Sequence, residues 1–93
     1  MISCDSGRCN VQGPLTMANV TGVLAQGAGL FQGSDVLVDL SGVTEVDSSA
    51  VSLLLEWRRQ AFAAKHRIVY VNLPSNLKSL ADLYGVSDLL GAS

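Results

Sequence analysis

The chain has 93 residues, of which 48% are hydrophobic and 15% charged, and its formal net charge is −2. This length predicts a single domain spanning residues 1–93, and the apolar share excludes intrinsic disorder. The chain has only six Lys and Arg residues, too few for a basic stripe along a phosphate backbone, so nucleic-acid binding is not expected. No apolar run approaches the roughly 20 residues that a membrane span requires.

The cysteines, the histidine and the N-terminal residues bear on compartment and on metal chemistry. No secretion signal follows Met1, so we expect a cytoplasmic protein whose thiols are reduced. Cys4 and Cys9 flank a predicted tight turn and could lie across a hairpin; we predict free, buried thiols, with a disulfide as the alternative. His66 is the only histidine and lies far along the chain from both cysteines, so no metal site and no cofactor are expected.

Hydrophobic periodicity and turn residues divide the chain into alternating elements. The predicted elements are strands over 1–4 and 8–11, a helix over 17–30, a strand over 36–40, a helix over 48–65, a strand over 68–73 and a helix from 74–75 to Gly85. Asp5-Ser6-Gly7 forms the first turn, Gly13-Pro14 ends the second strand, and 41–46 is a loop. Thr16 can cap the first helix, which carries Met17 among its apolar residues and which its glycines weaken. A strand–helix–strand unit implies parallel pairing of the last two strands. The fold class is therefore α/β, in the order β-β-α-β-α-β-α, with a mixed four-stranded sheet and packed helices.

The segment from Asp39 to Leu55 carries most of the functional information. It is a buried strand, a tight loop and a helix whose first turn bears hydroxyl groups. The amides and dipole of that turn would favour an anion, so a phosphate on Ser48 would meet a receptive backbone and repel an acidic partner. The alternative is that Asp47 simply caps the helix and that Ser48 and Ser49 are ordinary first-turn residues. The residues alone leave both interpretations open.

The helix over 48–65 is more apolar than one buried face requires. Its apolar arc is roughly 200° wide, whereas a surface helix needs about 100°. One flank of the arc consists of Val51, Leu55 and Phe62 and lies beside Ser48 and Ser52. We therefore expect apolar contact and a serine switch to share one partner surface. The alternative is that neighbouring helices cover both flanks.

At this point a family resemblance becomes specific. Asp39-Leu40-Ser41-Gly42-Val43, followed by Val46-Asp47-Ser48-Ser49 and an apolar helix, resembles the signature of STAS domains. This family includes the anti-sigma factor antagonists and the small cytoplasmic STAS subunit of Mla-type phospholipid ABC transporters. The family's regulatory hydroxyl residue, which is phosphorylated in antagonists, would be Ser48. Ala50 stands where antagonists usually have glycine, and the first strand is short; both departures are more similar to the transporter subunit.

The resemblance implies a non-catalytic accessory or regulatory subunit of a phospholipid-transporting ABC complex, which maintains outer-membrane lipid asymmetry. It would bind the ATPase subunit in the cytoplasm and reach the inner membrane only through that complex; a dimer is possible. The alternative is an anti-sigma factor antagonist that phosphorylation of Ser48 switches. No enzyme is expected, because no nucleophile, base and acid can be assembled around a single histidine. The expected partner interface consists of Asp47, Ser48, Ser49, Val51, Ser52, Leu55, Arg59 and Phe62.

Overall fold

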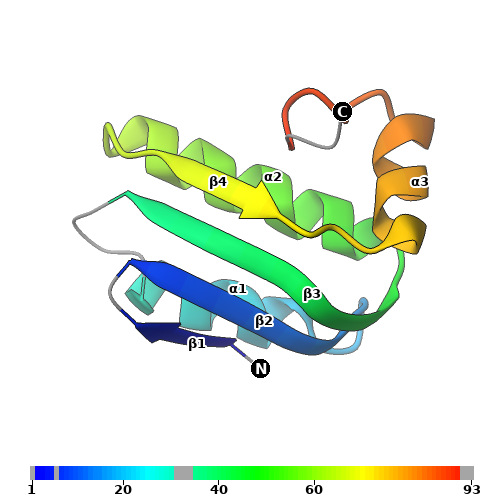
Figure 1. The fold of residues 1–93 in the computed structure, drawn as a ribbon, viewed down its shortest axis with the longest axis horizontal. Coiled ribbons are helices and arrows are strands. Elements are labelled where there is room, and N and C mark those ends of the chain that lie inside the picture. The colour runs from blue at the N-terminus through cyan, green and yellow to red at the C-terminus, as the bar shows by residue number, and fades with distance from the viewer. Residues whose placement is uncertain (1, 6, 31–34, 91–93) are drawn as a thin grey trace.

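The computed structural model describes residues 2–5, 7–30 and 35–90, so Met1 and Ser6 of the predicted hairpin lie outside it. Its elements are β1 (Ile2–Asp5), β2 (Arg8–Leu15), α1 (Val20–Leu30), β3 (Val36–Val46), α2 (Ser48–Ala63), β4 (Ile68–Val71) and α3 (Ser75–Leu83). The strands of the described chain form a four-stranded sheet in the order β1-β2-β3-β4 (Figure 1). β1 pairs with β2 antiparallel, and the other two pairings are parallel. The predicted α/β class, element order and parallel pairing of the last two strands are confirmed.

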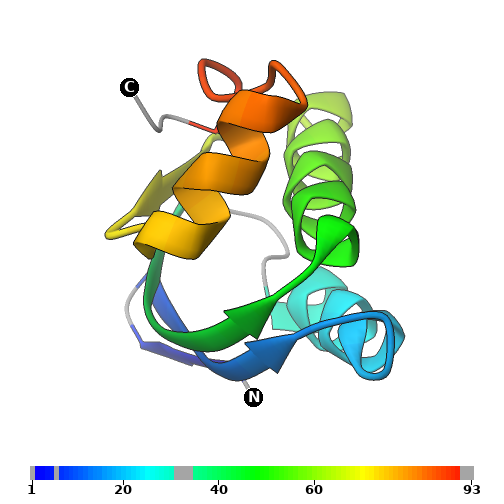
Figure 2. The ribbon, with the colours of Figure 1, turned by 90° about the vertical axis from the view of Figure 1, so that its right-hand side faces the viewer.

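The helices α1 and α2 cover one face of the sheet (Figures 1 and 2). The side chains of Cys9, Val38 and Tyr70 share one row across β2, β3 and β4, and all three are buried. The Tyr70 hydroxyl donates a hydrogen bond to the carbonyl oxygen of Leu54 in α2 at 2.7 Å, so this row faces α2. Val69, one position earlier in β4, points to the opposite face and is 49% exposed.

The central strands are longer than the sequence suggests. β2 continues through Gly13-Pro14 to Leu15, and β3 continues through the predicted loop to Val46, so both of these predictions are wrong. The pairing of β2 with β3 shifts register twice, and β3 carries an extra residue at each shift. Pro14 is tolerated because β1 pairs with β2 only as far as Val11, which leaves the end of β2 with a neighbour on one side.

The third helix begins after Pro74 and has Gly85, with a φ of 70°, directly after its C-cap Tyr84, as predicted, whereas α1 and α2 each differ from their predicted bounds at one end. α1 begins at Val20, three residues later than predicted, because the Thr16 carbonyl accepts bonds from the amides of Asn19 and Val20 in a turn that precedes the helix. α2 ends at Ala63, because Lys65 adopts a φ of 62° that a right-handed helix cannot continue. The last strand ends at Val71, because the next residue, Asn72, has a φ of 57°, which an extended strand cannot continue.

Cys4 and Cys9 form a disulfide, so the prediction of free thiols is wrong. They are direct partners in the β1–β2 ladder, with Cα atoms 4.0 Å apart. The hairpin register brings the two sulfurs together on the face that packs against the helices, where Cys9 is 1% exposed. The alternative pairing across the hairpin is therefore the observed one.

The helices α1 and α2 approach closely at a glycine. A Cβ atom on Gly27 of α1 would lie 2.4 Å from two ring carbons of Trp57, which is in α2 and is 1% exposed. The Trp57 indole nitrogen donates to the carbonyl oxygen of Leu24 at 3.4 Å. Gly27 thus weakens α1 as an isolated helix but allows the largest buried side chain to fill the space between the helices.

A buried carboxylate in β3 joins this strand to β2 and to the end of β4. Asp39 of β3 is 7% exposed and accepts hydrogen bonds from Arg8 of β2 at 2.6 Å and from the Ser41 amide at 2.9 Å. Asn72, which follows β4, donates to the same carboxylate at 3.3 Å. The hydrogen bonds from Ser41, with those from Asn72 and the charge of Arg8, lower the pKa of Asp39 to about 2 although burial raises it. Asp39, which opens the STAS-like signature, therefore has a structural role.

Candidate functional site

Asp47 caps α2, as the sequence predicts. It has extended backbone angles, and its Oδ1 accepts a hydrogen bond from the Ser49 amide at 2.8 Å. Its other oxygen, Oδ2, accepts from the amide of Met17 at 3.0 Å. The hydrogen bonds from Met17 and then from Ser49 lower the pKa of Asp47. The Asp47 carboxylate thus joins the segment before α1 to the start of α2.

This contact brings the backbone of an exposed apolar residue, Met17, to the start of α2. Met17 was expected to lie in the first helix, but it precedes α1, so that prediction is wrong, and its side chain is 77% exposed. Its amide is held by Asp47, immediately before Ser48. Sequence reasoning therefore missed Met17 as part of the surface around the start of α2. No local signal could have found it, because the contact spans 30 residues of the chain.

Ser48 is exposed at the first position of α2. The amides of the first turn are less available to an added phosphate than the sequence suggests. The Ser49 amide donates to the side chain of Asp47, and the Ala50 amide donates to the backbone carbonyl of Asp47 at 3.0 Å. A phosphate on Ser48 would also lie next to an ionised carboxylate. Its physical effect would therefore be to change the charge of this surface.

The outward face of α2 carries most of the predicted interface residues in one line. Ser48, Ser52 and Arg59 are exposed, Leu55 is partly buried against the core, and Phe62 is 77% exposed. They recur at spacings of three, four and seven residues, which place them on one side of a helix. Ser48 and Phe62 lie about 21 Å apart along the helix axis. The line is thus an extended surface and not a compact patch.

Val51 does not belong to this surface. Its side chain is 3% exposed and is part of the core. The helix α3 packs against α2, and it covers this flank (Figure 2). The prediction that Val51 contacts a partner is therefore corrected. The alternative, that a neighbouring helix covers the flank, holds at Val51 and fails at Phe62.

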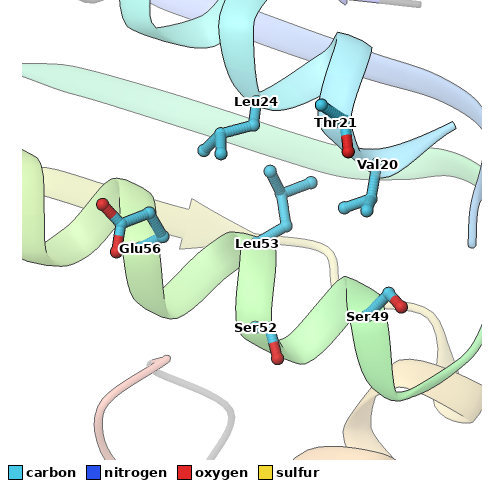
Figure 3. A pocket seen from close by; sticks show the side chains of 7 residues that line it. All are labelled: Val20, Thr21, Leu24, Ser49, Ser52, Leu53 and Glu56. Atoms are coloured by element: carbon cyan, nitrogen blue, oxygen red, sulfur yellow. The ribbon is translucent and has the colours of Figure 1, made fainter. Parts of the chain in front are cut away.

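A groove lies between α1 and α2, and two of the serines of α2 form part of its lining. It has a volume of about 330 Å³ and is lined by Val20, Thr21, Leu24, Ser49, Ser52, Leu53 and Glu56. Figure 3 shows Leu53 of α2 pointing toward Val20 and Leu24 of α1, which gives the groove an apolar floor. The predicted residues Ser49 and Ser52 are thus joined by a set of α1 residues that the sequence reasoning did not single out.

The charge in this groove is neutralised within the domain. Glu56 accepts hydrogen bonds from Arg59 at 2.5 and 3.0 Å and from Gln60 at 3.1 Å. These bonds, from Arg59 first, lower the pKa of Glu56. The remaining lining groups are hydroxyls and hydrocarbon, which suits an uncharged segment of another chain better than an ionic ligand.

The lining of this groove includes no histidine or cysteine. Among residues 2–5, 7–30 and 35–90, no group of three or more His, Cys, Asp or Glu side chains is placed to hold a metal ion. The helices that the structure describes include none that is long and apolar enough to cross a membrane.

Comparisons with known proteins agree with this architecture. The family model described as "Mlab, STAS domain" matches residues 2–91. The chain belongs to the STAS domain family. No match was found among curated proteins.

Solved structures show the same STAS fold at low identity. A structure of the anti-sigma factor antagonist SpoIIAA in its unphosphorylated form matches with a TM-score of 0.73 and 19% identity, covering 95% of this chain and 82% of that one. A crystal structure described as that of Mglu matches with a TM-score of 0.65 and 21% identity, covering 83% of this chain and 20% of that chain. The chain therefore spans about a fifth of the second protein, and both likenesses concern the fold.

Proposed function

We propose that this STAS domain is a non-catalytic accessory subunit of a phospholipid-transporting ABC complex and that it binds the ATPase subunit through α2. The observation that carries the proposal is the continuity between the exposed, serine-bearing start of α2 and the apolar α1–α2 groove. The family description, Mlab, supports this choice, because it is the type of STAS subunit that the sequence resembles.

The proposed docking surface consists of the groove and of the exposed line on α2, without Val51. It comprises Asp47, Ser48, Ser49, Ser52, Leu55, Arg59 and Phe62, with Met17 and the groove residues of α1 added. Because Glu56 is already paired with Arg59, the groove should accept an apolar segment of the ATPase whose polar groups meet the serine and threonine hydroxyls. The domain would then stabilise or tune the transporter that maintains outer-membrane lipid asymmetry.

This role places the protein in the cytoplasm, at the inner membrane only when it is in the complex. Cytosolic thiols are kept reduced, so the Cys4–Cys9 pair would be in its dithiol form there. The hairpin has other support, since β1 pairs with β2 from Ile2 to Asp5 and Ile2 is buried in the core. The proposal therefore requires that the domain folds without the crosslink.

Co-purification of tagged full-length chain with an Mla-type ATPase subunit from the same organism tests the proposal. Ser48→Glu and Ser52→Glu add a negative charge to exposed positions at the start of α2, and each should reduce recovery of the ATPase at least about tenfold. Ser79→Glu makes the same change at an exposed position of α3 and should leave recovery unchanged. Circular dichroism checks that all variants remain folded.

Equal recovery of the ATPase with all three variants would refute the proposed surface. Leu55→Asp is unsuitable for this test, because the Leu55 side chain is partly buried against the core and a charge there would also affect folding. No recovery of the ATPase even with the unmodified chain would refute the proposed partner.

A second candidate function is that of an anti-sigma factor antagonist switched by phosphorylation of Ser48. The observations that favour it are the structural match to SpoIIAA and the exposure of Ser48. Ala50 is no obstacle, because its methyl group is fully buried and does not face a partner. Incubation with radiolabelled ATP and a cognate anti-sigma kinase should label the unmodified chain and not Ser48→Ala. Absence of label on the unmodified chain would exclude this function.

A further inference from the structure

The C-terminal end of α2 holds most of the positive charge of the chain. Four of the six Lys and Arg residues lie between positions 58 and 67, namely Arg58, Arg59, Lys65 and Arg67, and the single histidine, His66, lies among them. Arg59 is paired with Glu56. In the part of the chain that the structure describes, Arg58, Lys65 and Arg67 form no ion pair with a carboxylate.

The fold turns this run of sequence into a pocket. Arg58, Phe62, His66, Arg67 and Ile68 line a hollow of about 130 Å³, and no acidic side chain takes part in the lining. The left-handed φ of 62° at Lys65 reverses the chain after α2 and brings Arg67 back beside Arg58. The His66 amide donates to the Ala61 carbonyl at 2.8 Å, which fixes this turn to the helix.

Helix-end electrostatics account for only part of this charge. The C-terminus of a helix carries the equivalent of about −0.5 charge, which favours a cation nearby. Arg58, Lys65 and Arg67 supply three positive charges around it, so a net positive potential remains. The nearest carboxylate contact is that of Asp35, whose Oδ1 accepts the backbone amide of Arg67 at 2.8 Å. Asp35 is not part of the pocket lining.

We propose that this pocket binds a phosphate group. Guanidinium groups present parallel N–H donors that match phosphate oxygens, and two arginines, Arg58 and Arg67, line the same hollow. His66 adds a ring N–H donor. Phe62 is 77% exposed and forms an apolar wall, which lowers the local dielectric and strengthens the ionic contacts. The volume suits one phosphate group and not a nucleotide.

A phospholipid headgroup and a soluble phosphate ester present the same chemistry to this pocket. The pocket lies at the opposite end of α2 from Ser48 and shares only Phe62 with the proposed docking surface, so failure of this proposal and failure of the proposed function are distinguishable. The two ends are about 21 Å apart along the helix axis. Binding at one end can therefore be measured without occupying the other.

The test is a titration of isotope-labelled full-length chain with inorganic phosphate, followed by amide NMR at constant ionic strength. The amides of Phe62, His66 and Arg67 should shift in a saturable manner. Arg58→Gln and Arg67→Gln should each weaken phosphate binding about tenfold or more, because each removes a charge-assisted pair of hydrogen bonds. Lys78→Gln is the control, because it removes one positive charge from an exposed position of α3, outside the pocket, and should leave binding unchanged.

Co-sedimentation with vesicles then identifies the source of the phosphate. Binding to phosphatidylglycerol–phosphatidylcholine vesicles, together with saturable phosphate binding, would assign a lipid headgroup. Saturable phosphate binding without vesicle binding would assign a soluble phosphate ester. Shifts that do not saturate, or that Lys78→Gln weakens as much as Arg58→Gln does, would overturn the proposal and indicate diffuse attraction instead. Vesicle binding without saturable phosphate shifts would overturn it equally.

Discussion

Substituting Gly27 with alanine should destabilise the protein, although alanine is the better helix former. Gly27 faces Trp57 across the contact between α1 and α2, and an added Cβ would lie 2.4, 2.4 and 2.5 Å from three atoms of the indole. Carbon atoms pack at about 3.5–4.0 Å, so the indole or the helix must move by about 1 Å. Trp57 is 1% exposed and has no solvent into which to move.

The magnitude follows from two opposing contributions. Overpacking a core costs about 1–3 kcal/mol. Replacing glycine by alanine in a helix returns about 1 kcal/mol. Displacement of the indole also weakens its hydrogen bond to the Leu24 carbonyl. We therefore expect Gly27→Ala to lower the free energy of unfolding by about 1–2 kcal/mol.

Urea unfolding followed by Trp57 fluorescence measures this change, because the chain contains a single tryptophan. With a slope near 1 kcal/mol per M for a domain of this size, the midpoint should fall by about 1–2 M. Gly29→Ala is the matched control, because nothing lies within 4 Å of its added Cβ. This variant should raise the free energy of unfolding by about 0.5–1 kcal/mol. Stabilisation of similar size in both variants would refute the close packing of Trp57 against α1.

Two further predictions concern stability. Hydrogen bonds from Ser41 are the main reason why the pKa of Asp39 is about 2, below its value of 3.8 in the absence of these partners. The carboxylate therefore stabilises the fold above about pH 4, and this contribution disappears as the pH falls through 2. Asp39→Asn should therefore be about 1–2 kcal/mol less stable at pH 7, with a smaller difference at pH 2.5, in urea titrations at both pH values; a constant difference would contradict this. Reduction of the Cys4–Cys9 disulfide, which closes a short loop, should lower the unfolding free energy by about 2 kcal/mol without unfolding the domain. The double variant Cys4→Ala/Cys9→Ala should show no response to reductant, and unfolding of the reduced chain at 25 °C would contradict the cytoplasmic placement.

The elements with local signals were predictable from the sequence. Val36 to Leu40 is a run of apolar residues that predicts a buried strand, and α2 has a capping aspartate at its start. The second half of β3 was missed, because Ser41-Gly42 has the composition of a turn. What makes this segment a strand is its partner: Gly42 pairs with Gln12, and a Cβ on Gly42 would lie 2.9 Å from the Gln12 side chain. Contacts of this kind join distant parts of the chain and leave no periodic pattern.

The candidate site was predictable to the same extent. The cap at Asp47 and the exposed serines follow from residue type and helix position. The burial of Val51 and the exposure of Met17 do not, because they depend on where α3 lies and on a hydrogen bond from Met17 to Asp47. The prediction of free thiols was wrong for another reason. It rested on the expected reducing compartment, whereas the hairpin register itself brings Cys4 and Cys9 together.

The structure also explains why the start of α2 can change without cost to folding. Asp47 supplies the cap and holds the amides of Met17 and Ser49, so the neighbouring Ser48 side chain has no capping role of its own. A modification or substitution at Ser48 should therefore alter what the surface binds before it alters whether the domain folds. At the other end of the helix, the left-handed backbone of Lys65 and the hydrogen bond to the Ala61 carbonyl fix the turn. The side chains of Arg58 and Arg67 therefore have no part in forming that turn. The residues that fix the two ends of α2 thus differ from the residues that are proposed to bind ligands there. Mutations at Ser48 and at Arg58 should therefore affect binding at one end of the helix each.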